Sequence, residues 1–378
     1  MNRIKKTAAP SARQKNNSVN CVSKTKHLVS SLLNWFAKEA RDLPWRRTRD
    51  PYAIWVSEIM LQQTQVKTVM PYWERWMREL PAIESLAKAS PEKIHKLWEG
   101  LGYYTRVRNM QKAAQQIRAQ HDGEFPARFD DVLALPGIGR YTAGAICSIA
   151  FNQPTPILDG NVIRVLTRVF GIAENPREKK TNAQLWQLAQ DLVDHASRIT
   201  HHTSCSHLNQ SMMELGALLC TPRQPQCDRC PISRHCIARR ENRIEELPNL
   251  GERAVATPRR FAAFVLENKG RLFVRQRPAD VVNAHLWEFP NVELPGPRAD
   301  LQQAVKRALG FSPRQLEPLC TIRHSITRYR ITLDAFAIRE TPDAAQIAIE
   351  GSWLKRAELE KLSFPSAHKK ILAAVRGQ

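Results

Sequence analysis

No run of apolar residues in this sequence approaches the roughly 20 that a membrane-spanning helix needs. Its first residues also lack the apolar segment of a secretory signal. The chain is poor in cysteine for a disulfide scaffold, with eight in 378 residues. These absences argue against a membrane protein and a disulfide-rich secreted protein. We therefore expect a protein of a reducing compartment, the cytoplasm.

Acidic residues are few compared with basic ones. The chain has 57 Lys and Arg against 36 Asp and Glu, which gives a net charge of +21. Such an excess attracts polyanions, and nucleic acid is the commonest of them. Charge alone leaves DNA, RNA and anionic lipid open as partners.

The first 26 residues have no acidic side chain at all. They carry seven Lys and Arg and almost no large apolar residue. A segment of this composition buries too little apolar surface to offset the entropy lost on folding. We expect residues 1–26 to be a disordered basic tail that solubilises the protein or binds DNA non-specifically.

The length of the chain suggests two domains, and residues 27–240 have the pattern of the first. Apolar residues recur there at three- and four-residue spacing, with no long alternating strand. Asp50-Pro51 is a typical helix start, with Asp as N-cap and Pro at the first helical position. The helix that follows is expected to carry Glu58 and to end near Pro71.

The pattern changes after a polar linker that contains Pro and Gly, residues 241–258. Residues 259–378 then combine segments of β pattern with amphipathic helical segments. This combination predicts an α+β domain that differs in construction from the mainly α domain before it. The expected strands are 261–267, 271–277, 286–292 and 330–338, and the expected helices are 301–309 and 367–375.

Four of the eight cysteines lie within seventeen residues. Short loops between them allow all four thiolates to bind one metal centre, and both zinc and a [4Fe–4S] cluster accept four cysteines. Zinc sites usually pair two closely spaced cysteine pairs, whereas only the middle pair is close here. The spacing therefore favours a structural iron–sulfur cluster that holds a basic loop (Arg223, Arg229 and Arg234) towards phosphate. The cysteines are Cys220, Cys227, Cys230 and Cys236.

Residues 135–146 read LPGIGRYTAGAI. One helix is expected to end at Leu135 and the next to begin near Tyr141. Between them, Gly137 and Gly139 permit a tight turn whose backbone N–H groups can approach a phosphate closely. This is a helix-hairpin-helix motif, which binds the DNA backbone without reading its sequence.

Two carboxylates stand where acid–base chemistry is possible. If the helix face of Glu58 is buried, desolvation raises its pKa and keeps it protonated, as a general acid must be. On sequence alone, an exposed helix glutamate is the commoner arrangement. Asp159 precedes a helix, so a plain N-cap and a catalytic carboxylate are both open. The hairpin upstream favours the catalytic interpretation.

Taken in order, these motifs resemble those of the MutY-type adenine DNA glycosylases of the endonuclease III superfamily. The resemblance is close over residues 28–238 and looser beyond. It implies a helix-hairpin-helix glycosylase domain of two helical subdomains and a Nudix-like lesion-recognition domain, the latter without the glutamate-rich signature that binds magnesium. The matching segments are LPWR (43–46), WVSEIMLQQTQV (55–66), GLGYYTRVRN (100–109), LPGIGRYTAG (135–144), ILDGNV (157–162) and the cysteine loop.

The resemblance implies a monofunctional glycosylase of base excision repair with a [4Fe–4S] cluster. Its expected substrate is double-stranded DNA with adenine opposite 8-oxoguanine or guanine, bound by a monomer. Endonuclease III has a lysine directly after the hairpin, whereas Tyr141 stands there in this chain and cannot form an imine. An endonuclease III-like glycosylase/lyase and a catalytically silent DNA-binding iron–sulfur protein remain as alternatives.

The resemblance also assigns roles to single residues. Glu58 would protonate N7 of the extruded adenine, and Asp159 would stabilise the oxocarbenium-like sugar. Asn161 and Tyr141 would position the sugar and the acid. The expected binding residues are Arg46 and Gln210 at the adenine, Trp45 in its pocket, Gln63 and Tyr103 as wedges in the duplex, and Gly137 and Gly139 at the DNA backbone.

One segment departs from the family pattern. The family usually presents Phe-Ser-His to 8-oxoguanine, and the corresponding residues here are Ile326, Thr327 and Arg328. Thr327 keeps a hydroxyl and Ile326 an apolar wedge, while Arg328 replaces the histidine. We expect lesion recognition to persist in altered form.

Overall fold

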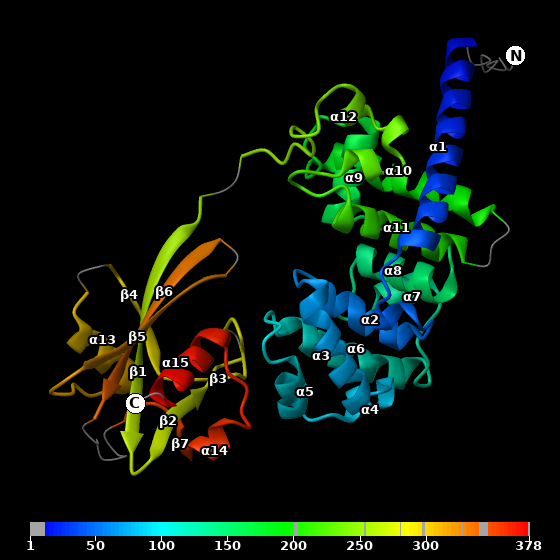
Figure 1. Cartoon of the computed structure of the whole chain (residues 1–378). Coiled ribbons are helices and arrows are strands. Elements are labelled where there is room, and N and C mark those ends of the chain that lie inside the picture. Colours follow the sequence, from blue (N-terminus) through cyan, green and yellow to red (C-terminus); the bar gives the residue numbers. More distant parts are fainter. Residues whose placement is uncertain are drawn as a thin grey trace, which may run out of the picture. The chain divides into compact units, whose positions relative to one another are not determined.

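The computed structural model describes residues 12–199, 203–252, 255–279, 281–296, 299–326, 328–339 and 347–376. The chain divides into two compact units (Figure 1). One comprises residues 1–77 and 116–252, and the other residues 78–115 and 253–378. The boundary at residue 252 lies in the predicted linker. Residues 78–115, which the sequence pattern placed in the helical domain, fall with the second unit.

All regular elements of the described residues between 27 and 240 are helical, as the sequence pattern predicted. In the described part of the chain, no helix has the length and apolar character to cross a membrane. The helices are α1 (Ala12–Glu39), η1 (Pro44–Arg46), α2 (Pro51–Leu61), α3 (Val66–Glu79), α4 (Ile83–Lys88), α5 (Pro91–Trp98), α6 (Thr105–Gln120), α7 (Phe129–Leu133), α8 (Arg140–Phe151), α9 (Gly160–Phe170), α10 (Lys179–Ser197), α11 (Ser204–Leu218), η2 (Cys227–Arg229), η3 (Ser233–His235) and α12 (Ile237–Arg240).

Helix α1 begins earlier than the sequence analysis predicted. The expectation of a disordered tail through residue 26 is wrong for residues 12–26, which belong to α1. After Pro10 the chain contains neither Pro nor Gly until Pro44. Nothing therefore interrupts the helix between its packed part and residue 12. Residues 1–11 lie outside the described residues.

Helix α2 begins as predicted and ends earlier. Asp50 caps it, because its Oδ1 accepts a hydrogen bond of 3.0 Å from the backbone N–H of Tyr52. The helix ends at Leu61, and Gln63 has a left-handed φ of 57°. Pro71, the expected end, lies inside α3 instead. The turn at residues 62–65 leaves α2 as a short helix that carries Glu58 into the core.

Helix α11 lies at the centre of the first unit. It packs against α1, α8, α9 and α10 (Figure 1), and apolar side chains from all of these helices form one core cluster. Its approach to α9 depends on Gly216, where a Cβ would lie 2.6 Å from Cβ of Asn161. Only a residue without a side chain permits this contact. The start of α9 is thereby held directly against α11.

A second glycine brings α8 against the segment that precedes α9. A Cβ on Gly144 would lie 2.2 Å from the backbone oxygen of Pro156. We expect Gly144→Ala to lower the free energy of unfolding by about 1–3 kcal/mol, because the added methyl forces the backbone apart. Urea denaturation measures this change as a lower midpoint.

Gly139→Ala is the matched control for this stability measurement. A Cβ there would meet nothing within 4 Å, and the backbone is extended. Alanine is a poorer N-cap than glycine, so we expect a loss of at most about 0.5–1 kcal/mol, less than that of Gly144→Ala. Equal stabilities of the two variants would contradict the close contact at Gly144.

The second unit contains a seven-stranded sheet with the order β3-β2-β1-β6-β5. Strand β1 is its centre, parallel to β6 and antiparallel to β2 and β4, while β7 pairs with β2. The elements are β1 (Thr257–Asn268), β2 (Arg271–Gln276), β3 (Trp287–Glu288), β4 (Asn291–Leu294), α13 (Leu301–Leu309), β5 (Glu317–Ile326), β6 (Tyr329–Ile338), β7 (Ser352–Lys355), α14 (Arg356–Leu359) and α15 (Ser366–Arg376).

Strand β1 is buried on both faces. Ala263 and Val265 belong to a core cluster with residues of α15. Phe264 and Leu266 belong to another with residues of α13. Because side chains alternate along a strand, the two helices cover opposite faces of the sheet (Figure 1). The predicted α+β fold is confirmed.

Candidate active site

Glu58 is a buried carboxylate on a buried helix. Its residue is 5% exposed, so the commoner arrangement of an exposed helix glutamate is wrong here. The hydroxyl of Tyr141 donates a hydrogen bond of 2.8 Å to its Oε2. Burial raises the pKa of Glu58 to about 7, and repulsion by Asp159 acts in the same direction. The carboxyl group can therefore carry a proton near neutral pH.

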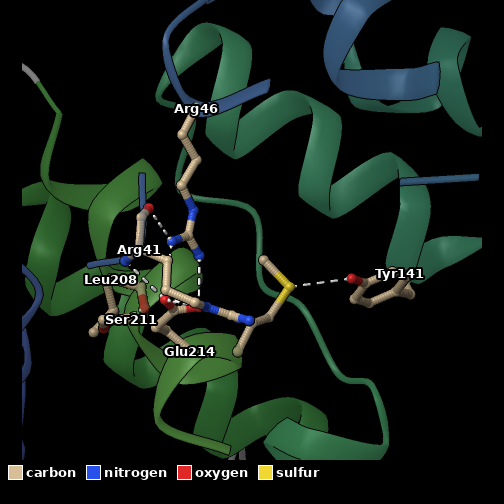
Figure 2. Close-up of polar contacts among 7 residues, drawn as sticks. Arg41, Arg46, Tyr141, Leu208, Ser211 and Glu214 are labelled. Carbon is tan, nitrogen blue, oxygen red and sulfur yellow. Dashed lines mark hydrogen bonds and ion pairs between the residues drawn. The ribbon is translucent and has the colours of Figure 1, made fainter. Parts of the chain in front are cut away.

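Tyr141 comes to Glu58 from the first turn of α8. Its hydroxyl also lies 3.2 Å from Sδ of Met213 on α11 (Figure 2). Burial and the neighbouring carboxylates raise the pKa of Tyr141 well above its usual value of 10. The phenol therefore stays protonated and acts as a hydrogen-bond donor.

Asp159 is the N-cap of α9 and lies near Glu58. Its Oδ1 accepts a hydrogen bond of 2.8 Å from the backbone N–H of Val162, and its Oδ2 accepts one of 3.0 Å from Nδ2 of Asn161. Burial raises the pKa of Asp159, while these hydrogen bonds oppose the rise. The cap geometry that the sequence suggested is present. A cap also leaves the carboxylate close enough to Glu58 for the two charges to interact.

Asn161 connects Asp159 to the centre of the unit. Its Oδ1 accepts a hydrogen bond of 2.8 Å from Nη2 of Arg164. The same guanidinium donates to the backbone oxygens of Gly216 (2.8 Å) and Cys220 (2.7 Å). Arg164 is buried, so the start of α9 is tied to the end of α11 in the interior.

The hairpin between α7 and α8 has the predicted form. Gly137 has a φ of 78°, a left-handed conformation that favours glycine. Gly139 is the N-cap of α8 and is open to solvent, with nothing within 4 Å of the position a Cβ would take. Exposed backbone N–H groups at a helix N-terminus suit an anion such as phosphate.

Arg46 is fixed by an ion pair with Glu214. The guanidinium donates to the carboxylate through Nη1 (3.1 Å) and Nη2 (2.9 Å), and Arg41 donates to the same carboxylate (Figure 2). Arg46 also lies over the ring of Phe36. Its charge lowers the pKa of Glu58, which places it within electrostatic reach of the acid.

The other expected base-binding residues are buried near this ion pair. Trp45 precedes Arg46 on η1, is 6% exposed and packs edge-on against Trp73. Gln210 lies one turn before Glu214 on α11 and donates a hydrogen bond of 3.1 Å to Oγ of Ser206. The structure thus brings Arg46 towards Glu58, while Gln210 bonds within its own helix.

Sequence reasoning did not single out Arg41, Met213 or Glu214. Glu214 stands in the apolar run SMMELGALL, which is the same signal that drew attention to Glu58. Its arginine partners are 168 and 173 residues away in the sequence. Only the fold identifies them.

Gln63 and Tyr103 share an unusual backbone conformation. Their φ angles are 57° and 46°, a region that costs free energy for residues with side chains and is enriched at functional sites. Tyr103 is 46% exposed, although it is a large aromatic residue. Each residue lies in an exposed turn of its own unit, where its side chain can insert between the bases of a bound nucleic acid.

The four clustered cysteines line one small cavity beside α9 and α11. Burial raises the pKa of Cys227, Cys230 and Cys236, and repulsion among the thiolates adds to the rise. Nη1 of Arg168 donates to Sγ of Cys220 at 3.4 Å. Within the described ranges, no three Cys, His, Asp or Glu side chains form a group that could hold a metal ion.

The loop around these cysteines is basic at its surface. Arg223, Arg229 and Arg234 are all exposed, as expected for a loop that faces phosphate. Arg229 donates to Oε1 of Gln226, its neighbour in the loop, at 2.9 Å.

Ile326 and Arg328, two residues of the segment that departs from the family pattern, lie at the tip of the β5–β6 hairpin. Ile326 ends β5 opposite Tyr329, the first residue of β6. Arg328 is exposed and its Nη2 lies 3.0 Å from the hydroxyl of Tyr329. Thr327 lies outside the described residues.

Two family models match the chain. The model of the HhH-GPD superfamily of base excision DNA repair proteins matches residues 56–191. This range includes Glu58, Tyr141 and Asp159. The model of the NUDIX domain matches residues 262–374, which contain the sheet of the second unit except the first residues of β1.

Curated relatives extend over both regions. Human adenine DNA glycosylase is 36% identical over 92% of this chain and 74% of its own length. The adenine DNA glycosylase of Buchnera aphidicola subsp. Acyrthosiphon pisum (strain APS) is 38% identical over 70% of this chain and 75% of its own. Among solved structures, a thermostable thymine-DNA glycosylase matches with a TM-score of 0.53 and 29% identity, covering 58% of this chain and 99% of its own.

Proposed function

The chain belongs to the adenine DNA glycosylases of the helix-hairpin-helix superfamily, and from that premise we propose that its substrate is adenine opposite 8-oxoguanine or guanine in double-stranded DNA. The enzyme is a monofunctional adenine DNA glycosylase. Our proposal concerns three further points: the base opposite the adenine, the roles of single residues and the bound cofactor. Its DNA substrate and its free cysteines suit the cytoplasm.

Glu58 is the general acid of the proposed mechanism. It transfers its proton to N7 of the extruded adenine, and the bond between C1′ and N9 breaks with its electron pair on the departing base. The supporting observation is the burial of Glu58, which raises its pKa to about 7. Tyr141 orients the acid by its hydrogen bond of 2.8 Å to Oε2.

Asp159 stabilises the positive charge that develops on the sugar. Burial raises the pKa of Asp159, and its hydrogen bonds from Val162 and Asn161 oppose that rise. The proposed mechanism uses this carboxyl in its ionised form while Glu58 carries a proton. Water then adds to C1′ and passes a proton to the carboxylate of Glu58, which restores the acid and completes hydrolysis. Asn161 positions the carboxylate and the sugar.

Arg46, Trp45 and Gln210 hold the adenine in this proposal. Gln63 and Tyr103 insert into the duplex, and the backbone at Gly137 and Gly139 binds phosphate. Gln63, Tyr103, Gly137 and Gly139 are exposed, and the first three have a positive φ, which supports the roles in DNA binding. Unstacking a base costs a few kcal/mol, and inserted side chains compensate for the lost stacking.

Tyr141 accounts for the absence of a lyase step. A phenol cannot form the imine through which a lysine cleaves the DNA strand. Its hydroxyl is already committed to Glu58 and Met213. The alternative of an endonuclease III-like glycosylase/lyase therefore has no amine at this position.

We propose a [4Fe–4S] cluster on Cys220, Cys227, Cys230 and Cys236. All four cysteines line one cavity, and a [4Fe–4S] cluster binds each thiolate at a different iron, so the four sulfurs need not converge on one point as they would around a single metal ion. When bound, the cluster supplies iron–thiolate bonds that tie residues 220–236 into one loop. The exposed arginines of that loop then meet the DNA backbone. The iron and sulfide content of the purified protein measures the proposal directly.

Lesion recognition is assigned to the tip of the β5–β6 hairpin. Arg328 replaces a histidine of the family pattern and is exposed there, and Ile326 ends the strand before it. Thr327, outside the described residues, is the third residue that the sequence assigned to this role. A guanidinium can donate to the carbonyl oxygen at C8 of 8-oxoguanine. Guanine lacks that oxygen, so the tip favours the oxidised base.

Base release from matched duplexes tests the whole proposal. The duplexes carry adenine opposite 8-oxoguanine, guanine, cytosine or thymine, and we expect release in the first two only. Borohydride should trap no covalent adduct, because Tyr141 forms no imine. Trapping as efficient as that of a lysine enzyme would favour the glycosylase/lyase. Equal release from all four duplexes would contradict the proposed substrate.

A further inference from the structure

The carboxylate of Glu214 is the meeting point of two arginines inside the first unit. Its side chain is 1% exposed. Arg41 donates to it through Nε (2.8 Å), Nη2 (2.6 Å) and its backbone N–H (3.0 Å), and Arg46 donates through Nη1 and Nη2. Figure 2 shows both side chains converging on this carboxylate.

Glu214 is ionised at neutral pH. Burial would raise its pKa, but the hydrogen bonds from Arg41 and Arg46 bring it down to about 2. A buried carboxylate with this many charge-assisted hydrogen bonds holds its partners rigidly. Removing it would leave two guanidinium groups without their common counter-ion.

Arg46 is the more constrained of the two arginines. Its side chain is 14% exposed, against 33% for Arg41. Nη1 also donates to the backbone oxygen of Arg41 at 3.0 Å. Within the described residues, these contacts use three N–H bonds of a group that has five donors. The others stay available to acceptors such as the ring nitrogens of a base.

The same turn of α11 also reaches the acid. Met213, the residue before Glu214, contacts the hydroxyl of Tyr141 at 3.2 Å, and Tyr141 donates to Glu58. Arg46 acts on Glu58 through its charge. One turn of α11 therefore positions both the phenol that orients the acid and the arginine beside it.

We infer that Glu214 is a positioning residue for base recognition, which holds the guanidinium of Arg46 in one orientation towards the extruded adenine. The inference rests on the proposed role of Arg46 at the base. Glu214 does not touch the substrate and acts through Arg46. Its loss therefore misaligns the bound adenine for the chemical step and leaves the DNA contacts in place.

Single-turnover release of adenine opposite 8-oxoguanine tests this inference with the full chain. We expect Glu214→Asn to slow release by on the order of 10- to 100-fold, because small misplacements of a reacting group have effects of this size. The affinity for the same duplex should change by less than about threefold, since the phosphate contacts that dominate affinity are untouched. Aspartate has almost the same volume as asparagine but keeps the negative charge. Glu214→Asp should therefore release adenine at least about tenfold faster than Glu214→Asn.

A double-mutant cycle separates positioning from general stability. If Glu214 acts through Arg46, adding Glu214→Asn to Arg46→Gln should not slow release further. Glu178→Gln, at an exposed glutamate before α10, is the control and should match the parent chain. Rates are compared at a temperature where circular dichroism shows each variant folded.

Four outcomes would overturn the inference. They are an unchanged rate in Glu214→Asn, equal rates in the Asn and Asp variants, additive effects in the cycle, and a loss of DNA affinity as large as the loss of rate. If Glu214→Asn does not fold, Glu214→Asp takes its place in the cycle. It should then slow release relative to the parent chain and have no further effect in the Arg46→Gln background. Failure of the parent chain to release adenine would instead contradict the proposed function.

Discussion

Replacing Glu58 with glutamine is expected to slow adenine release by on the order of 10³-fold, the scale of general acid catalysis. Glutamine has nearly the same shape and can still accept the hydrogen bond from Tyr141, but it cannot give a proton to N7. The effect is measured as single-turnover release from a duplex with adenine opposite 8-oxoguanine. DNA affinity, measured by fluorescence anisotropy, should stay within about threefold of the parent value.

The pH dependence of the parent chain provides the second part of this prediction. The protonated form of Glu58 is the active one, and burial raises its pKa to about 7. The rate should therefore be highest below that pH and fall as the pH rises through it. The glutamine variant should lack this decline. Full activity in the variant, or a rate that rises through pH 7, would contradict the role of Glu58.

Asp159→Asn is expected to slow release by on the order of 10²- to 10³-fold. Asparagine is as good an N-cap as aspartate, so its Oδ1 can still accept from the backbone N–H of Val162. The variant therefore keeps the start of α9. It loses the negative charge near the sugar and the hydrogen bond that Oδ2 accepts from Asn161. Its thermal unfolding midpoint should stay close to that of the parent chain, and the rate is measured in the same single-turnover assay.

This variant distinguishes the two interpretations of Asp159 that the sequence left open. A plain N-cap predicts no loss of activity on replacement by asparagine. Asp300→Asn is the matched control, because Asp300 caps α13 through backbone N–H groups in the same way and has no place in the mechanism. Similar rates for both variants and the parent would sink the catalytic role of Asp159.

Local sequence signals predicted the elements that local physics determines. The predicted helix at residues 301–309 has the bounds of α13, since its apolar face, Asp cap and terminal Gly310 agree. Asp50 and Pro51 likewise predicted the start of α2. Strand β5 was not predicted, because it contains Pro318 and an irregular register, and most of its residues are not fully buried. The short strand β7 carries no pattern of its own.

The sequence singled out Glu58, Tyr141 and Asp159, which the structure brings together, but it did not predict their environment. Whether Glu58 is buried depends on how α2 packs against the rest of the unit, which its own periodicity does not reveal. The end of α2 depends on a left-handed residue, Gln63, that no glycine marks. The pairing of Glu214 with Arg41 and Arg46 joins distant parts of the chain. Tertiary packing supplies these features, so a local pattern cannot contain them.

The two glycines whose contacts lie on either side of Asp159 bear on whether the protein or the nucleotide moves during the reaction. Gly144 brings α8 against the backbone of Pro156, and Gly216 brings α11 against Asn161. With a helix in contact on each side, the carboxylate has little room to follow a substrate. The nucleotide must then make the movement: it leaves the base stack and rotates into an active site that is already formed.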